Sequence, residues 1–249
     1  MVKSVYLHGN PGGPDELPLL GGEAVSSWFV PDRSALPLEP EARLSALAGM
    51  ISDACGCEPI RLVGFSAGAH VALQVAARLR DANLVLHLVS PAGPLETGDF
   101  LDMMAGGPIF RTAMKRPQLL SALVRAQSLG ARAVPGLLMR LLFTSAQGGD
   151  RALLDEEQFS RSYKAVLQHC LVAGRLSYQA EIKAYVRPWA GLLAEVRHPV
   201  TIWQGSADNW TPPEMAQAMA QLLPQVTAFN LLEGQSHFST LRAALAALA

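Results

Sequence analysis

Cysteine, charge and long apolar runs are all scarce in this sequence of 249 residues. Three cysteines give neither an even set for disulfides nor a C-x-x-C pair, which favours reduced thiols and a cytoplasmic location. Twenty basic residues balance 21 acidic ones, so no cationic field is present to bind nucleic acid. Arg140 interrupts the most apolar stretch, residues 134–143, and the N-terminal apolar run is shorter than a signal peptide. We therefore expect no membrane span.

What the chain does have is apolar residues in a regular arrangement. Half of the residues are hydrophobic, which excludes a disordered chain. Short apolar runs alternate with helical patterns near both ends of the chain. These runs lie at residues 2–7, 26–31, 60–63, 84–89, 200–204 and 227–232. Such alternation is typical of a parallel sheet covered by helices on both faces, so we predict an α/β fold.

The middle of the chain follows a different pattern. Residues 97–188 contain no convincing strand, and their helical segments are separated by the glycine-rich linkers at 106–108 and 148–149. The helical patterns lie at residues 100–116, 118–129, 136–143, 155–173 and 177–185. We therefore predict an α/β core formed by residues 1–96 and 189–249, into which residues 97–188 are inserted as a helical lid.

Ser66 is the first candidate for chemistry. It lies in the pentapeptide Gly-Phe-Ser-Ala-Gly at 64–68, between a predicted strand and a predicted helix. A serine on such a turn projects its hydroxyl from the carboxyl edge of the sheet, and the glycines tolerate the strained backbone. The amides at the start of the following helix could stabilise an oxyanion. The alternative is that Ser66 only caps this helix.

A nucleophilic serine needs a base, and His237 is the best placed of the six histidines. It follows the last predicted strand, at the edge of the sheet where Ser66 emerges. The other histidines are expected to have simpler roles. His8 orders the loop after the first strand, and His87 is a core residue. The remaining three pack against other residues or face solvent: His70, His169 and His198.

The base in turn needs an acid, for which Asp208 is the main candidate. It follows the penultimate strand in the segment Gly205 to Pro212, again at the carboxyl edge. Asp208 could instead form only an Asx-turn. Glu96 and Asp99, after the fourth predicted strand, are rival acids.

The loop after the first strand reads His8-Gly9-Asn10-Pro11-Gly12. Because Pro11 has no N–H, the Asn10 amide is the expected oxyanion donor of this loop, with the Ala67 amide as its partner. A phosphate-binding loop is excluded, since neither G-x-G-x-x-G nor G-x-x-x-x-G-K-[ST] is present.

Taken together, these segments resemble the α/β-hydrolase superfamily, in particular its capped esterase, haloperoxidase-like and epoxide-hydrolase-like branch. The resemblance spans nearly the whole chain, in the order nucleophile, acid, histidine. It implies that Ser66 is the nucleophile, Asp208 the orienting acid and His237 the base, with no metal and no cofactor. Serine at position 66 argues against the dehalogenases and epoxide hydrolases, which use aspartate there.

Two features depart from the family pattern. Its members usually have further strands before the His-Gly loop, whereas this chain begins with that strand. We therefore expect a reduced, mostly parallel sheet of about six strands. In addition, the glycine-containing turn that usually follows Pro31-Asp32-Arg33 is replaced by Ser34-Ala35-Leu36.

The leading hypothesis is a serine hydrolase that cleaves a small-molecule carboxylic ester, or a related acyl compound, through an acyl-enzyme. An apolar substrate pocket is expected from Phe65, Met103, Met104, Phe110, Met139 and Phe143. Acidic and basic residues both occur in the inserted segment, so no strongly charged substrate is indicated. The same triad also serves carbon–carbon bond hydrolases and cyanohydrin lyases, and a ligand-binding protein without turnover is a further alternative.

Overall fold

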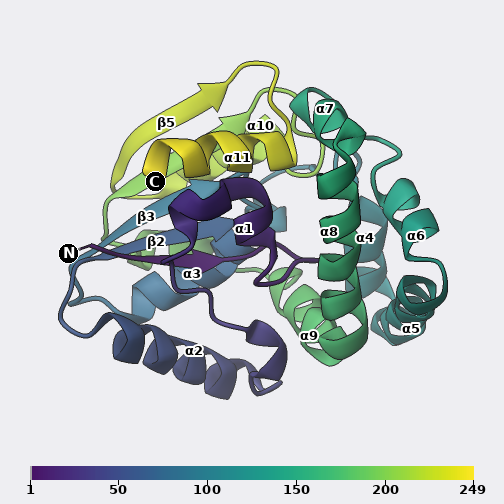
Figure 1. Ribbon diagram of the computed structural model, residues 1–249. Helices are drawn as coiled ribbons and strands as arrows, with labels where there is room; N and C mark the ends of the chain where they lie inside the picture. The colour runs from purple at the N-terminus through teal and green to yellow at the C-terminus, as the bar shows by residue number, and fades with distance from the viewer. Residues whose placement is uncertain (1) are drawn as a thin grey trace.

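The computed structural model describes residues 2–249 and contains a five-stranded, entirely parallel sheet (Figure 1). The strands lie side by side in chain order. They are β1 (Lys3–Leu7), β2 (Ile60–Phe65), β3 (Leu84–Val89), β4 (Val200–Gly205) and β5 (Val226–Leu232). The α/β-hydrolase fold predicted from the sequence is confirmed, with five strands rather than about six.

The strand expected at residues 26–31 is the one that does not form. Phe29 makes a single bridge to Val5, in which its N–H donates to Ser4 and its carbonyl accepts from Tyr6, both at 2.9 Å. Pro31 follows two residues later, and its lack of an N–H prevents the ladder from continuing.

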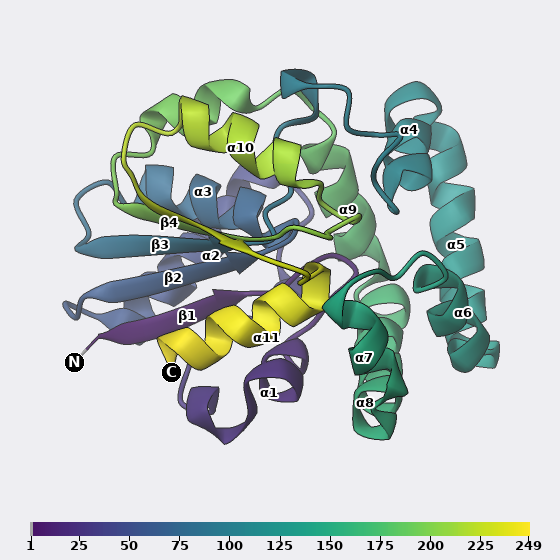
Figure 2. The ribbon, with the colours of Figure 1, turned by 90° about the horizontal axis from the view of Figure 1, so that it is seen from above.

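Helices cover both faces of the sheet (Figure 2). One face is packed by α2 (Pro40–Cys55), α3 (Gly68–Arg78) and α10 (Pro213–Leu222), and the other by α1 (Glu16–Gly21) and α11 (His237–Leu248). Successive residues of β1 alternate between the two cores: Val5 and Leu7 contact one, and Tyr6 the other. Both faces of the strands are therefore apolar, as a sheet buried on both sides requires.

Between β3 and β4 the chain forms helices only, at the right of Figure 1. These are α4 (Gly107–Lys115), α5 (Pro117–Ala133), α6 (Pro135–Leu142), α7 (Gly149–Asp155), α8 (Glu157–Gln168) and α9 (Arg175–Tyr185). A π-helical turn, η4 (His169–Ala173), joins α8 to α9. We refer to residues 97–188 as the helical insertion.

Short 3₁₀ turns complete the chain: η1 (Gly22–Val25), η2 (Arg33–Ala35), η3 (Leu95–Thr97) and η5 (Ala190–Glu195). The sequence signals for several helix starts are clear, because proline occupies the first turn of α2, α4, α5, α6 and α10. Helix α11 begins with a capping box between Ser236 and Ser239. Within residues 2–249, no helix is long and apolar enough to cross a membrane.

Candidate active site

Ser66 occupies the sharp turn between β2 and α3. Its φ is +54°, a left-handed conformation that is uncommon for a residue with a side chain. The turn is held from both sides: the Ser66 N–H donates to the Val89 carbonyl, and the Ser66 carbonyl accepts from Ala69 and Ala92, each at 3.0 Å. The backbone thus fixes the strained serine at the carboxyl edge of the sheet, as at a nucleophile elbow.

Two glycines allow this turn to sit close to its neighbours. A Cβ atom at Gly68 would lie 2.2 Å from the carbonyl oxygen of Leu7, at the end of β1. A Cβ atom at Gly64 would lie 2.8 Å from the Cα of Ala69. Both contacts involve backbone, so a side chain at either position would displace α3 from the sheet.

Asp208 and His237 form a buried pair after β4 and β5. His237 Nδ1 lies 2.9 Å from Asp208 Oδ2, and the residues are 2% and 4% exposed. The other carboxylate oxygen accepts the N–H groups of Trp210 and Thr211 at 2.9 and 3.0 Å. Asp208 therefore makes an Asx-turn and also lies within hydrogen-bond distance of His237.

The histidine and several hydrogen bonds lower the pKa of this acid. Burial alone would raise the pKa of Asp208, but His237 and the hydrogen bonds from Thr211 and Ser90 hold it below its ordinary value. The Thr211 hydroxyl lies 3.1 Å from Asp208 Oδ2 and 3.0 Å from the Ser90 carbonyl. Sequence reasoning missed Ser90, whose φ of +42° marks a second strained position at this edge.

His237 is enclosed by aromatic rings and begins α11. Its ring centroid lies 4.6 Å from that of Phe65 and 5.6 Å from that of Trp210, which is nearly parallel to it. The amides of the next two residues, Phe238 and Ser239, donate to the carboxylate of Asp150 at 3.2 and 2.8 Å. Asp150 belongs to α7, so a carboxylate of the insertion holds the start of the histidine helix.

Asp150 directly follows the linker Gly148-Gly149, and an aspartate in the first turn is typical of a helix start, the one local signal for this residue. Burial raises the pKa of Asp150 above its ordinary value, despite the two amides that donate to it.

Asn10 and Ala67, the expected oxyanion donors, both line the cavity that Ser66 also lines. Within residues 2–249 neither backbone N–H donates to another protein group. The loop before Asn10 is held by a residue that the sequence did not indicate. Glu16, fully buried on α1, accepts hydrogen bonds from the Gly9 N–H at 3.1 Å and the Tyr6 hydroxyl at 2.5 Å. Burial raises the pKa of Glu16 to about 7.

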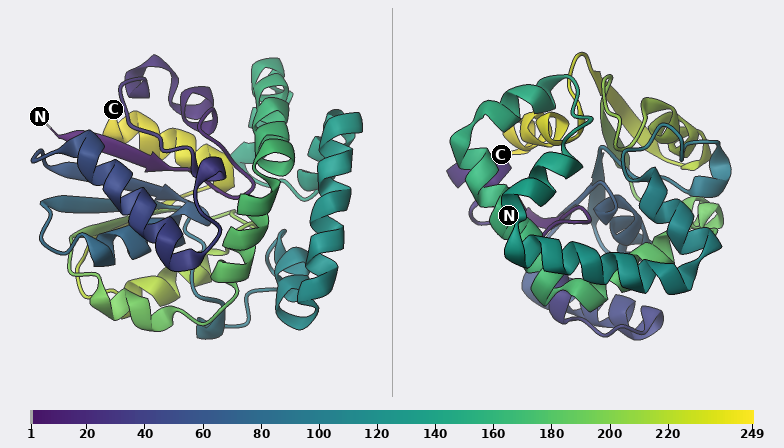
Figure 3. Two further views of the ribbon diagram at one scale, coloured as in Figure 1. Left: turned by 90° about the horizontal axis from the view of Figure 1, so that it is seen from below. Right: turned by 90° about the vertical axis from the view of Figure 1, so that its right-hand side faces the viewer.

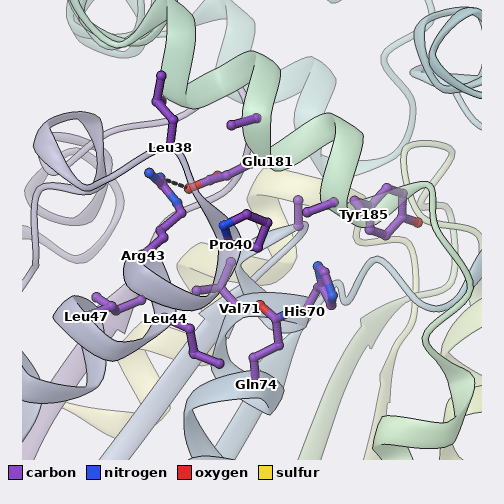
Figure 4. A pocket seen from close by; sticks show the side chains of 13 residues that line it. Leu38, Pro40, Arg43, Leu44, Leu47, His70, Val71, Gln74, Glu181 and Tyr185 are labelled. Carbon is purple, nitrogen blue, oxygen red and sulfur yellow. Dashed lines mark hydrogen bonds and ion pairs between the residues drawn. The ribbon is translucent and has the colours of Figure 1, made fainter. Parts of the chain in front are cut away.

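A second carboxylate, whose side chain is only 12% exposed, ties the same loop to the insertion. Glu181 of α9 pairs with Arg33 at 2.9 Å and with Arg43 at 2.5 Å, and it accepts from the Asn10 side-chain amide at 3.2 Å. Arg33 also donates to the His8 carbonyl. Figure 4 shows Arg43 facing Glu181 beside a small cavity of about 60 Å³. Burial would raise the pKa of Glu181, but the two guanidinium groups lower it to about 2.

The cavity that Ser66 lines has a volume of about 300 Å³ and lies between the core and the insertion. The core contributes Asn10, Pro11, Ser66, Ala67, Ala92, Trp210 and Thr211. The insertion contributes mostly apolar side chains, among them Met104, Phe110, Leu123, Leu141, Leu142 and Ile182. Its polar groups, Gln127, Ser145 and Tyr178, are few.

Of the six residues expected in the pocket, two line this cavity: Met104 and Phe110. Phe65 is buried beneath His237, and Met103 is 45% exposed at the surface. Met139 and Phe143 are buried in a hydrophobic cluster and line a different cavity. The rival acids Glu96 and Asp99 do not line the cavity, and Glu96 accepts instead from the amides of Trp189 and Ala190. In the described residues, 2–249, no cluster of three or more His, Cys, Asp or Glu could hold a metal ion.

A parallel sheet with a strained serine after β2, and with an acid–histidine pair at the same edge, defines the α/β-hydrolase class of fold. The sequence profile described as "Alpha/beta hydrolase family" matches residues 5–249, and the chain belongs to this family. No curated protein matches the sequence.

Solved structures with the same fold include enzymes of several kinds. A bromoperoxidase from Bacillus anthracis has a TM-score of 0.66 at 16% identity, over 98% of this chain and 88% of its own. A thermophilic esterase from Thermogutta terrifontis has a TM-score of 0.67 at 18% identity, over 100% and 88%. A hydrolase from Oleispira antarctica has a TM-score of 0.66 at 15% identity, over 99% and 89%. At such identities the likeness concerns the fold.

Proposed function

We propose that this protein is a serine hydrolase that cleaves carboxylic esters or related acyl compounds through an acyl-enzyme. The observation that carries the proposal is the buried Asp208–His237 pair, at 2.9 Å, at the sheet edge where Ser66 adopts its strained turn. Membership of the α/β hydrolase family supports it independently.

In the proposed reaction His237 takes the proton of the Ser66 hydroxyl while the serine oxygen bonds to the acyl carbon. Asp208 stabilises the resulting imidazolium, and the amides of Asn10 and Ala67 bind the oxyanion. The carbon–oxygen bond to the alcohol then breaks, and the alcohol leaves with the proton from His237. In the second half a water molecule gives its proton to His237 and attacks the acyl carbon. The acid leaves, and the proton returns to Ser66.

The shape of the cavity supports a substrate of modest size. Its volume of about 300 Å³ is at the small end of the range for ligand sites, and its wall is mainly apolar. Since core and insertion each supply part of the wall, we propose that the helical insertion acts as a lid that shields the acyl group from water.

Substitution of Ser66 by alanine is the decisive test. We expect Ser66→Ala to lower kcat for p-nitrophenyl esters of graded acyl length by roughly 10³–10⁶-fold, with an unchanged circular dichroism spectrum. Ser52→Ala is the matched control, because Ser52 is exposed on α2 and away from the cavity, and this variant should retain activity. A fluorophosphonate should add one adduct to the native protein and none to Ser66→Ala, as read by intact mass. Full ester turnover by Ser66→Ala would refute the proposal.

A further inference from the structure

The outer surface of the insertion is unusually apolar. Helices α5 and α6 and the residue between them expose large apolar side chains, by 37% to 67% of their area. These are Leu119, Leu123, Leu129, Val134, Leu137 and Leu141, which we call the α5–α6 face. Helix α5 also buries Leu120 and Val124 on its inner side. A helix that covers a protein core normally has a polar outer side, so the leucines outside are not explained by packing of the core.

The segment that carries this face has charges of one sign. Residues 103–149 contain six basic side chains and no aspartate or glutamate: Arg111, Lys115, Arg116, Arg125, Arg132 and Arg140. All except Arg111, which pairs with Asp102, are exposed. The basic residues are therefore concentrated in one part of an insertion whose overall charge is mixed. Because the whole chain has a net charge of −1, the residues outside this segment carry a net negative charge.

The α5–α6 face adjoins the entrance to the cavity. Leu123 and Leu141 are both exposed and both line the cavity that contains Ser66. The cavity thus opens among the exposed leucines. Figure 3, in its right panel, shows α5 running across the side of the molecule that the insertion covers.

We propose that the α5–α6 face docks on an anionic lipid surface, from which acyl substrates enter the cavity between Leu123 and Leu141. A lipid layer offers acyl chains to the leucines and phosphate groups to the arginines, so it satisfies both features of the face. A second copy of this chain would instead bring like charges together across a two-fold axis. The inference rests on the proposed function, because it names the source of the acyl substrate.

Binding of the full chain to vesicles tests this proposal. We expect sedimentation with vesicles of phosphatidylcholine and phosphatidylglycerol, roughly tenfold weaker binding to phosphatidylcholine alone, and loss of binding at high salt. The double variant Arg125→Glu/Arg132→Glu should lose most of this binding. Its matched control is Arg80→Glu/Arg197→Glu, which reverses two exposed arginines of the core and should bind like the native protein.

The outcomes separate docking from catalysis. Ser66→Ala should bind vesicles as well as the native chain, and Arg125→Glu/Arg132→Glu should hydrolyse a water-soluble short-chain ester at the native rate. A native protein that turns over this ester but ignores anionic vesicles would overturn the docking proposal alone. Equal binding by the two double variants would do the same, as would a stable dimer that buries the α5–α6 face. A Ser66→Ala variant that still hydrolyses the ester would overturn the proposed function alone.

Discussion

Two carboxylates with little exposure, Glu181 and Asp150, join the insertion to the core, and their hydrogen-bond partners differ. Glu181 pairs with the guanidinium groups of Arg33 and Arg43, whereas the Asp150 side chain accepts from backbone amides at the start of α11. Burial acts to raise the pKa of both, yet that of Glu181 falls to about 2 while that of Asp150 stays above its ordinary value. The comparison indicates that the partial charges of a helix terminus orient a carboxylate but lower its pKa less than a full positive charge does.

The contact made by Glu181 should be the more costly to break. Glu181→Gln leaves the guanidinium groups of Arg33 and Arg43, whose side chains are 2% and 12% exposed, without a counter-charge. We expect the free energy of unfolding to fall by about 3–5 kcal/mol in denaturant titrations. Glu41→Gln is the control, because Glu41 pairs with Arg78 at the surface, where 67% and 41% of the two side chains are exposed. Its effect should stay below about 1 kcal/mol. Similar losses in both variants would contradict this assignment.

Removal of the charge at Asp150 should have a smaller effect. An asparagine keeps one acceptor oxygen for the amides of Phe238 and Ser239, so Asp150→Asn should cost about 1–2 kcal/mol of unfolding free energy. Because these amides follow His237 directly, we also expect kcat to fall by roughly threefold to tenfold, with little change in KM. Asp155→Asn, at the exposed end of the same helix, should change neither quantity. If Asp150→Asn matched Glu181→Gln in its loss of stability, the distinction between the two contacts would be lost.

The sequence predicts the core of the molecule better than the contacts between core and insertion. The strand at residues 84–89 forms as predicted, because an apolar run is a local signal. The sequence also predicts that Asp208 and His237 lie near each other, because both follow parallel strands and such strands end at one edge, and the structure places them within hydrogen-bond distance. The positions of the strands in the sequence therefore predict that these residues meet at that edge.

The site residues that the sequence did not indicate are positioned by tertiary contacts. Whether a glutamate such as Glu16 or Glu181 is shielded from solvent depends on helices far apart in the sequence, and no local pattern reports it. Which side chains line the pocket also depends on tertiary packing. Because α6 carries apolar residues on several sides, only its rotation decides that Leu142 lines the cavity while Met139 is buried in a hydrophobic cluster.

Lowering the pH gives the smallest expected effect, and it separates the two contacts because their contributions to stability should change in opposite directions. The pKa of Glu181 is lower in the folded chain, so its contribution is complete above the unfolded value of 4.5 and is lost as the pH falls towards 2. The pKa of Asp150 is higher in the folded chain, so its folded form takes up a proton first and gains stability as the pH falls towards 3.8. The stability lost in Glu181→Gln should therefore shrink below pH 4.5, whereas that lost in Asp150→Asn should grow. Denaturant titrations of the native chain and both variants between neutral pH and pH 3 measure the two trends, and parallel trends would show that the amides of α11 act like a full positive charge.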